Sequence, residues 1–310
     1  MSNYAIETQG LQRDFKTLRA VDNLSLSIQA GSIFGFLGPN GAGKTTTIRL
    51  LLGLLEPSAG EAQVLGYDIR TQAPEIRQVC GALLENHGLY ERLSAEENLE
   101  YYGRIWHIAR RERLQRQQNL LESLGLWDRR KEAIVEWSRG MKQKLAVARA
   151  LFHHPRLVFL DEPTAGLDPV AAASLRDDLG QLAMQEGVTV FLTTHNLTEA
   201  EKLCHQVGVI RQGRLIAVGS PEELRNRSSV PRVEVRGSGF SEKLISELNS
   251  RPEVKTISLR NGSLWLELNA ETSVTPLVSL LIAGGAQVEE VRRDKASLED
   301  VFLTLMEEEK

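Results

Sequence analysis

The stretch Gly38-Pro39-Asn40-Gly41-Ala42-Gly43-Lys44-Thr45-Thr46 decides the fold of this chain, because it fits the phosphate-binding pattern G-x-x-x-x-G-K-[ST]. The apolar run 33–37 before it is typical of a short buried strand, and apolar residues at helical spacing follow it. Such a loop turns its backbone N–H groups and a positive helix end toward one point, which suits a polyphosphate. We therefore predict a bound nucleoside triphosphate, with Lys44 reaching its β- and γ-phosphates and Thr45 binding Mg²⁺.

The composition is that of an ordinary globular protein. The chain has 310 residues, of which 42% are hydrophobic and 25% charged, and this length predicts two domains. The net charge of −4 provides no bulk attraction to nucleic acid or anionic lipid, so we expect no nucleic-acid partner. Cys80 and Cys204 lie in apolar surroundings without metal-ligand spacing, which indicates reduced core thiols.

The N-terminal residues lack the basic and apolar regions of a secretory signal, so we expect none. No apolar run approaches the roughly 18 residues that a membrane-spanning helix needs. We therefore expect a cytoplasmic protein. If it acts in a membrane process, another chain must supply the membrane part.

A second motif narrows the chemistry. The apolar strand 157–160 delivers Asp161 and Glu162 at its carboxyl end. Asp161 can hold Mg²⁺, normally through water, and Glu162 can act as the general base for an attacking water. The phosphate loop alone leaves kinases, GTPases, helicases and pumps possible. The long separation between Lys44 and Asp161 argues against a compact kinase core and predicts an inserted helical subdomain at about 86–153.

With these motifs in order, the chain resembles the ATP-binding subunits of ABC transporters over roughly residues 4–226. The resemblance implies an ABC-type ATPase that uses ATP and Mg²⁺. The implied fold is an α/β P-loop core with a mixed sheet, an antiparallel β subdomain and a helical subdomain. Besides the phosphate loop and the strand ending in Asp161-Glu162, it rests on Phe15, Trp137-Ser138-Arg139-Gly140-Met141, Thr164–Asp168 and Thr193-Thr194-His195.

The resemblance also implies a role for each of these residues. Phe15 would stack on the adenine ring, and His195 would contact the γ-phosphate and orient the water. Ser138 and Gly140 lie near the start of a helix, where a hydroxyl, free N–H groups and the helix dipole form an anion site. In the family this site meets the γ-phosphate held by the other subunit of a dimer, and Asp168 couples the two sites across the interface.

Two departures from the family pattern affect the site. Where the family usually has Gln as a Mg²⁺ ligand, this chain has Glu85, and we hypothesise that Glu85 retains the metal role. The family signature is usually Leu-Ser-Gly-Gly-Gln, so Trp137, Arg139 and Met141 are substitutions. Two positions remain open for the Arg139 guanidinium: near the phosphate of the partner subunit, or in solvent.

The C-terminal part has its own order of elements. We expect an ATPase domain at 1–227, a linker at 228–232, and a ferredoxin-like βαββαβ accessory domain at 233–310. The substituted signature and the closing sequence 296–303 resemble a branch that powers exporters with separately encoded membrane subunits. That branch includes drug-resistance and sodium-extrusion pumps. The apolar stripe of the closing helix, which begins at Ser297, most simply packs the core of the accessory domain, and a dimer or regulatory contact is the alternative.

The function expected from the resemblance is a peripheral subunit on the inner face of the cell membrane. It would drive export of a drug-like, lipid-like or ionic solute through a separate transmembrane permease, as a homodimer. The surface around residues 86–90, which include Leu89 and Tyr90, and the helices that follow it are expected to contact that permease. The rival is a soluble ABC ATPase acting on the ribosome or nucleic acid, which the single core and the lack of heptads disfavour. A regulator without turnover is disfavoured because Glu162 and His195 are both present.

Overall fold

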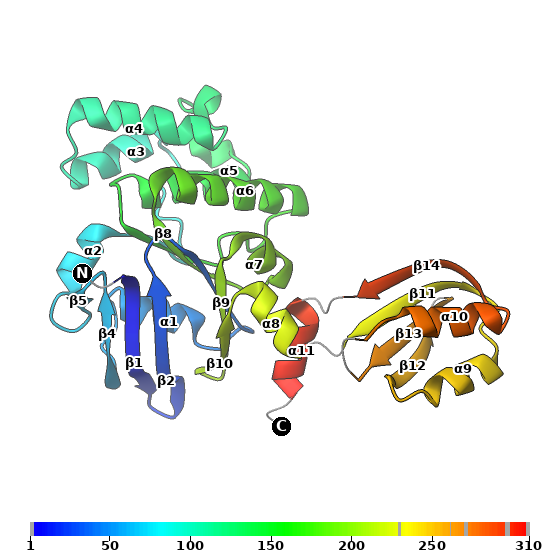
Figure 1. The fold of residues 1–310 in the computed structure, drawn as a ribbon. Helices are drawn as coiled ribbons and strands as arrows, with labels where there is room; N and C mark the ends of the chain where they lie inside the picture. The colour runs from blue at the N-terminus through cyan, green and yellow to red at the C-terminus, as the bar shows by residue number, and fades with distance from the viewer. Residues whose placement is uncertain (1–2, 229–230, 261, 270–271, 295–297, 308–310) are drawn as a thin grey trace. The chain divides into compact units, whose positions relative to one another are not determined.

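The computed structural model divides the chain into two compact units, Met1–Pro221 and Glu222–Lys310 (Figure 1). It describes residues 3–228, 231–260, 262–269, 272–294 and 298–307. The division falls at one end of helix α8 (Pro221–Ser228), earlier than the domain end that the sequence suggests at 227. Of the expected linker, 228–232, residues 229 and 230 lie outside the described residues, and Arg232 already begins strand β11.

The first unit is built on a central sheet in which every strand runs parallel except β10, the edge strand, which runs antiparallel to β9. The parallel strands are buried along nearly their whole length, as expected where helices or a second sheet cover both faces. The strand order is β10-β9-β3-β8-β7-β6. The strands are β3 (Ile33–Leu37), β6 (Cys80–Leu83), β7 (Leu157–Asp161), β8 (Thr189–Thr194), β9 (Gln206–Arg211) and β10 (Arg214–Gly219).

A second, antiparallel sheet has the order β2-β1-β4-β5 and the strands β1 (Tyr4–Phe15), β2 (Leu18–Gln29), β4 (Ala59–Val64) and β5 (Tyr67–Asp68). The sequence predicts only short strands near Tyr4–Thr8 and Leu24–Ile28. The sequence pattern underestimates their length because register shifts, between Thr8 and Leu11 and again beyond Leu11, interrupt the alternation of apolar residues. The pairing of β1 with β2 continues through these shifts. Phe15, which the sequence left outside any strand, is therefore the last residue of β1.

The sequence predicts helix starts from a capping box at Ser94 and from Asp168 ahead of Pro169, and both helices begin there. The helix predicted to begin at Met141 begins instead at Arg139. Ser94 and Glu97 form the expected capping box, and Asp168 caps α6 ahead of Pro169. No helix in the described residues is long and apolar enough to cross a membrane. The helices are α1 (Lys44–Leu51), α2 (Ala73–Val79), α3 (Ala95–Ile105), α4 (Arg110–Ser123), α5 (Arg139–Leu151), α6 (Pro169–Glu186) and α7 (Leu197–Leu203), with 3-10 turns η1 (Trp127–Arg129) and η2 (Ile134–Glu136).

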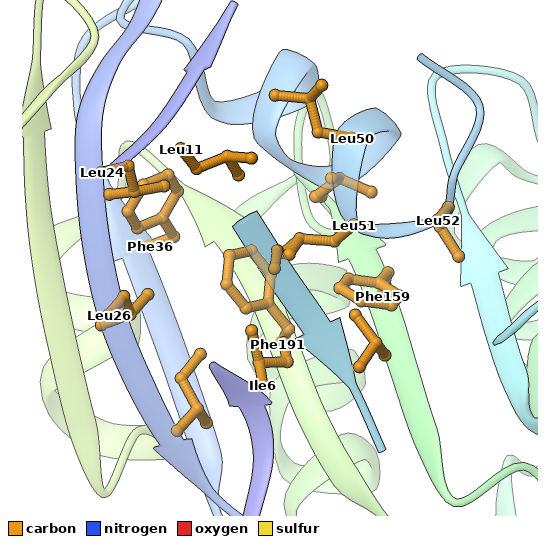
Figure 2. Close-up of a cluster of buried hydrophobic side chains, with 14 of the residues drawn as sticks. Ile6, Leu11, Leu24, Leu26, Phe36, Leu50, Leu51, Leu52, Phe159 and Phe191 are labelled. Carbon is orange, nitrogen blue, oxygen red and sulfur yellow. The ribbon is translucent and has the colours of Figure 1, made fainter. Parts of the chain in front are cut away.

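The core of the first unit lies around α1, which contacts both sheets. Figure 2 shows aromatic side chains of the central sheet among aliphatic side chains of α1 and the antiparallel sheet. Phe191 is fully buried, and its ring centroid lies 5.5 Å from that of Phe36 and 5.6 Å from those of Phe34 and Phe159. These aromatic contacts fix strands β3, β7 and β8 relative to one another. Several of the predicted site residues lie at or just after the carboxyl ends of these strands. Cys80 and Cys204 are buried free thiols, as expected.

Replacing Phe191 with Ala is expected to lower the free energy of unfolding by about 3–5 kcal/mol, because it leaves a cavity among three other rings. Equilibrium unfolding in urea measures this change. The control is Val170→Ala, at a side chain that is 80% exposed, which is expected to change stability by less than about 0.5 kcal/mol. Equal losses for both variants would contradict the central place given to Phe191.

The second unit has the expected βαββαβ order and one antiparallel sheet, with the strand order β12-β13-β11-β14 of a ferredoxin-like fold. Its core packs the sheet against α9 and α10 and includes Val235, Leu248 and Leu281. The fold class predicted from the sequence is confirmed. The elements are β11 (Arg232–Ser238), α9 (Glu242–Asn249), β12 (Val254–Arg260), β13 (Ser263–Leu268), α10 (Thr275–Ala283), β14 (Gln287–Asp294) and α11 (Leu298–Glu307). Ser297, the expected start of the closing helix, lies outside the described residues.

Candidate nucleotide-binding site

The phosphate loop runs from the end of β3 to the start of α1 and packs closely on its neighbours. A Cβ atom on Gly38 would lie 2.4 Å from the carbonyl oxygen of Ile210. One on Gly43, where φ is 107°, would lie 2.3 Å from that of Ala20. Glycine is therefore required at both positions. Helix α1 begins at Lys44, so its free N–H groups lie at the loop, as the anion site requires.

A pocket of about 640 Å³ opens beside this loop. It brings together residues that are far apart in the sequence. Phe15, at the turn between β1 and β2, forms one wall, and the Arg13 guanidinium lies 4.6 Å from the centre of its ring. The predicted site residues that line the pocket are Phe15, Asn40, Gly41, Ala42, Gly43, Lys44, Thr45, Thr46, Glu85, Arg139, Asp161, Glu162 and His195.

Lys44 is buried, and its ammonium group is held on two sides. Its Nζ donates hydrogen bonds to the carbonyl oxygens of Gly38, at 2.7 Å, and Pro39, at 3.2 Å. It also lies 3.0 Å from Oε1 of Glu162. The side chain is thus aimed along the loop toward the place where the phosphates are expected.

Oxygen atoms suitable for a magnesium ion meet at the end of β7. The Thr45 hydroxyl donates to Oδ2 of Asp161 at 2.7 Å, and the Thr193 hydroxyl donates to Oδ1 at 2.6 Å. Hard oxygen donors are what Mg²⁺ prefers, with water and substrate phosphates completing its shell. The described residues contain no cluster of three His, Cys, Asp or Glu that could hold a metal. Glu85 lines the same pocket, is two-thirds exposed, and pairs with Arg49 at 3.3 Å.

Glu162 lies between Lys44 and His195. Its Oε2 is 2.5 Å from Nδ1 of His195. Its backbone has φ of 52°, a left-handed conformation that is uncommon outside glycine. The backbone N–H of Glu162 donates to the Thr193 hydroxyl at 3.0 Å and to its carbonyl oxygen at 3.1 Å, which stabilises this conformation. The carboxylate is therefore fixed at the pocket, which is what a general base needs.

The remaining signature residues lie at the start of α5, outside the lining of this pocket. Ser138 caps the helix by accepting a hydrogen bond from the backbone N–H of Met141 at 3.3 Å. A Cβ on Gly140 would lie 3.1 Å from that of Ala171 in α6. Asp168 caps α6 and is exposed. Within one chain, Ser138, Gly140, Met141 and Asp168 therefore do not share the pocket with Lys44.

Arg139 is exposed, in agreement with the solvent position that the sequence left open, and its approach to a phosphate of the partner subunit stays a prediction. Its guanidinium lies against Gly166, where an added Cβ would come within 2.3–2.7 Å of three guanidinium atoms. It lines the pocket of its own chain, as Glu162 does. Arg139 therefore adds a positive charge beside the phosphate loop of the same chain.

Sequence reasoning missed several lining residues: Leu18, Ala20, Leu84, His87, Gln143 and Ala165. The most consequential omission is Thr193, because its hydroxyl joins Asp161 to the backbone of Glu162. In the sequence, Thr193 only precedes His195 by two positions. No signal along the sequence identifies it, because Thr193 meets Asp161 only through the pairing of β8 with β7.

The fold and the pocket define a P-loop ATPase with an inserted helical subdomain. A family model described as "ABC transporter" matches residues 21–165, and one described as "ATP-binding protein DrrA1-3-like, C-terminal domain" matches 219–306. The chain belongs to the ATP-binding subunits of ABC transporters and is an ABC-type ATPase.

Three comparisons support this assignment. The chain is 33% identical to the bacitracin transport ATP-binding protein BcrA of Bacillus licheniformis, with 97% of each protein covered. It is 34% identical to the daunorubicin resistance ATP-binding protein DrrA3 of Streptomyces coeruleorubidus, covering 98% of this chain and 96% of that one. A solved structure of an ATP-binding subunit of an ABC transporter matches with a TM-score of 0.64 and 29% identity, covering 72% of this chain and 92% of that chain.

Proposed function

We propose that this chain drives export of a drug-like, lipid-like or ionic solute through a separate transmembrane permease, from the cytoplasmic face of the membrane. The observation that supports this most is the pocket in which Lys44, Thr45, Asp161, Glu162 and His195 meet. Relatives named for bacitracin transport and daunorubicin resistance favour transport over an action on the ribosome or nucleic acid.

In the proposed reaction, each side chain acts from the position described above. Lys44 binds the β- and γ-phosphates, and the exposed face of the Phe15 ring receives the adenine. Glu162 takes a proton from the attacking water, and His195 orients that water against the γ-phosphate. Mg²⁺, when bound by Thr45 and Asp161 with Glu85 nearby, would offset the negative charge on the phosphates.

The signature helix is proposed to serve a second copy of the chain. Ser138 and Gly140 lie at a helix N-terminus, where N–H groups and the helix dipole favour an anion. Neither residue lines the pocket of its own chain, so a partner chain is the source of the phosphate they would bind. A homodimer then buries two ATP molecules between its subunits, with Asp168 near both sites.

A group of exposed tyrosines is the proposed contact with the permease. Tyr90 is 45% exposed and Tyr101 is 42% exposed, and their rings meet edge to face with centroids 4.8 Å apart. Tyr102 packs against both rings, and its hydroxyl donates to the carbonyl oxygen of Gly88. Large rigid aromatic side chains are the typical anchors of protein interfaces. This surface follows Glu85 in the chain, so movement there can reach the nucleotide pocket.

Replacing Leu89 with Ser and Tyr90 with Ala together is expected to weaken binding to the permease by about 30-fold or more, which is the effect of losing one central interface residue. Co-purification of the tagged ATPase with its membrane partner from detergent extracts measures this loss. The control is Leu114→Ala, at a side chain on α4 that is 54% exposed. Unchanged co-purification of the Leu89 and Tyr90 variant would rule out this docking surface.

A further inference from the structure

A buried carboxyl group that contacts Thr164 and Thr194 has no role in the function proposed above. Glu199 is in the first turn of α7 and only 4% exposed. Its Oε2 accepts hydrogen bonds from the Thr164 hydroxyl at 2.7 Å and the Thr194 hydroxyl at 3.2 Å. It forms no ion pair with any side chain that the structure describes. A buried acid held only by two hydroxyl groups calls for an explanation.

The two hydroxyl groups come from the two segments that carry the proposed catalytic side chains. Thr164 follows Glu162 by two residues, in the segment that leads from β7 to α6. Thr194 is the last residue of β8 and directly precedes His195. One oxygen atom of Glu199 therefore joins the backbone segment of Glu162 to that of His195.

A simple capping role does not account for this arrangement. Asn196 already caps α7, since its Oδ1 accepts from the backbone N–H of Glu199 at 3.2 Å. An acid in the first turn also interacts favourably with the helix dipole. Neither effect needs Thr164, which belongs to a different segment. The bond from Thr164 is also the shorter of the two that Glu199 accepts from hydroxyl groups.

The chemistry of the contact requires an acceptor oxygen more than a charge. Burial raises the pKa of the Glu199 carboxyl above its ordinary value, and the nearby negative charge of Glu162 acts in the same direction. The hydroxyl groups of Thr164 and Thr194, and the charge of Arg176, act against that rise. Whether or not it carries a proton, the group accepts both hydroxyl hydrogens at one oxygen. A glutamine amide oxygen can do the same.

We propose that Glu199 is a positioning residue for ATP hydrolysis, which ties the Thr164 segment to the Thr194 segment and so keeps Glu162 against His195. This rests on the roles proposed for Glu162 and His195. It assigns Glu199 no contact with ATP, water or metal. Because the phosphate loop is not part of the tie, the group affects the chemical step and leaves nucleotide binding alone.

The test compares Glu199→Ala with Glu199→Gln in the full-length chain. Loss of the tie is expected to lower kcat by about tenfold to a hundredfold, since displacement of reacting groups by about 1 Å has effects of that size. KM for ATP should change little in Glu199→Ala. The thermal midpoint should fall, because the hydroxyl groups of Thr164 and Thr194 lose a buried acceptor, so kcat is corrected for the folded fraction. Glu199→Gln should restore kcat to near the wild-type value. The matched control is Glu201→Ala, at another acid of the same helix.

A double-mutant cycle separates a tie from a general loss of packing. Thr164→Val should lower kcat in the wild-type chain and cause no further loss in Glu199→Ala, because the bond is already gone. Additive effects, or a Gln variant as slow as the Ala variant, would overturn the proposal. So would an Ala variant with unchanged kcat.

Glu162→Gln is measured in the same series. Normal turnover there would refute the proposed catalytic roles, and the Glu199 proposal with them. Slow turnover there beside unchanged Glu199→Ala would refute the Glu199 proposal alone.

Discussion

Replacing Glu162 with Gln is expected to lower kcat for ATP hydrolysis by about 10²–10⁴-fold, the usual contribution of a positioned general base. Gln has nearly the same shape as Glu and can still accept a hydrogen bond from Lys44 through its amide oxygen. It cannot take a proton from water. The loss is therefore expected in the chemical step rather than in folding. Steady-state turnover, corrected for the fraction of folded protein, measures it.

ATP binding should survive this substitution and even strengthen. In the wild-type chain, Oε1 of Glu162 lies 3.0 Å from Nζ of Lys44, so the carboxylate and the phosphates compete for one ammonium group. A neutral amide competes less strongly. Equilibrium binding of a slowly hydrolysed ATP analogue tests this, with Glu61→Gln, at an exposed side chain of β4, as the control. A Glu162→Gln chain that turns over ATP as fast as the Glu61 control would show that the base is elsewhere.

The sequence predicted the parts of this site that are contiguous along the chain. The phosphate loop needs a strand, a glycine-rich turn and a helix start, and all three are local features. The same is true of Asp161 and Glu162, because an apolar strand places whatever follows it at the sheet edge. The helix caps at Ser94 and Asp168 were predictable for the same reason.

What the sequence did not predict depends on contacts between distant segments. The long β1 was missed because its register shifts break the alternation that identifies a strand. Thr193 has its role only because β8 pairs with β7. The place of Arg139 against Gly166 depends on how α5 approaches the segment before α6. Composition and periodicity along one segment carry no information about such contacts.

Mixed dimers provide the sharpest test of a nucleotide site shared between two chains. In one copy, Lys44→Ala removes the ammonium that binds the phosphates. In the other, Ser138→Asp keeps a good helix cap but places a carboxylate where the partner's phosphate is expected. Each variant alone should be inactive. A mixed dimer should keep one intact site, formed by Lys44 of one chain and Ser138 of the other, and so retain up to about half of the wild-type turnover.

A second dimer distinguishes a site shared between two chains from a site within one chain, because the two models predict opposite results for its ATP turnover. When one chain carries both substitutions and its partner is wild type, every shared site has one defect, so turnover should be absent. If each chain instead used its own Lys44 and Ser138, this dimer would be active and the first would not.

Differently tagged copies, purified through both tags, give dimers of defined composition. The number of ATP molecules that stay bound to each dimer after rapid desalting gives the number of intact sites, even if turnover needs both sites. Ser138→Asn, which keeps the cap without the charge, is the control for helix α5. It should retain most of the activity, because the repulsion of phosphate by the Asp carboxylate, and not a damaged helix, is the expected cause of the loss.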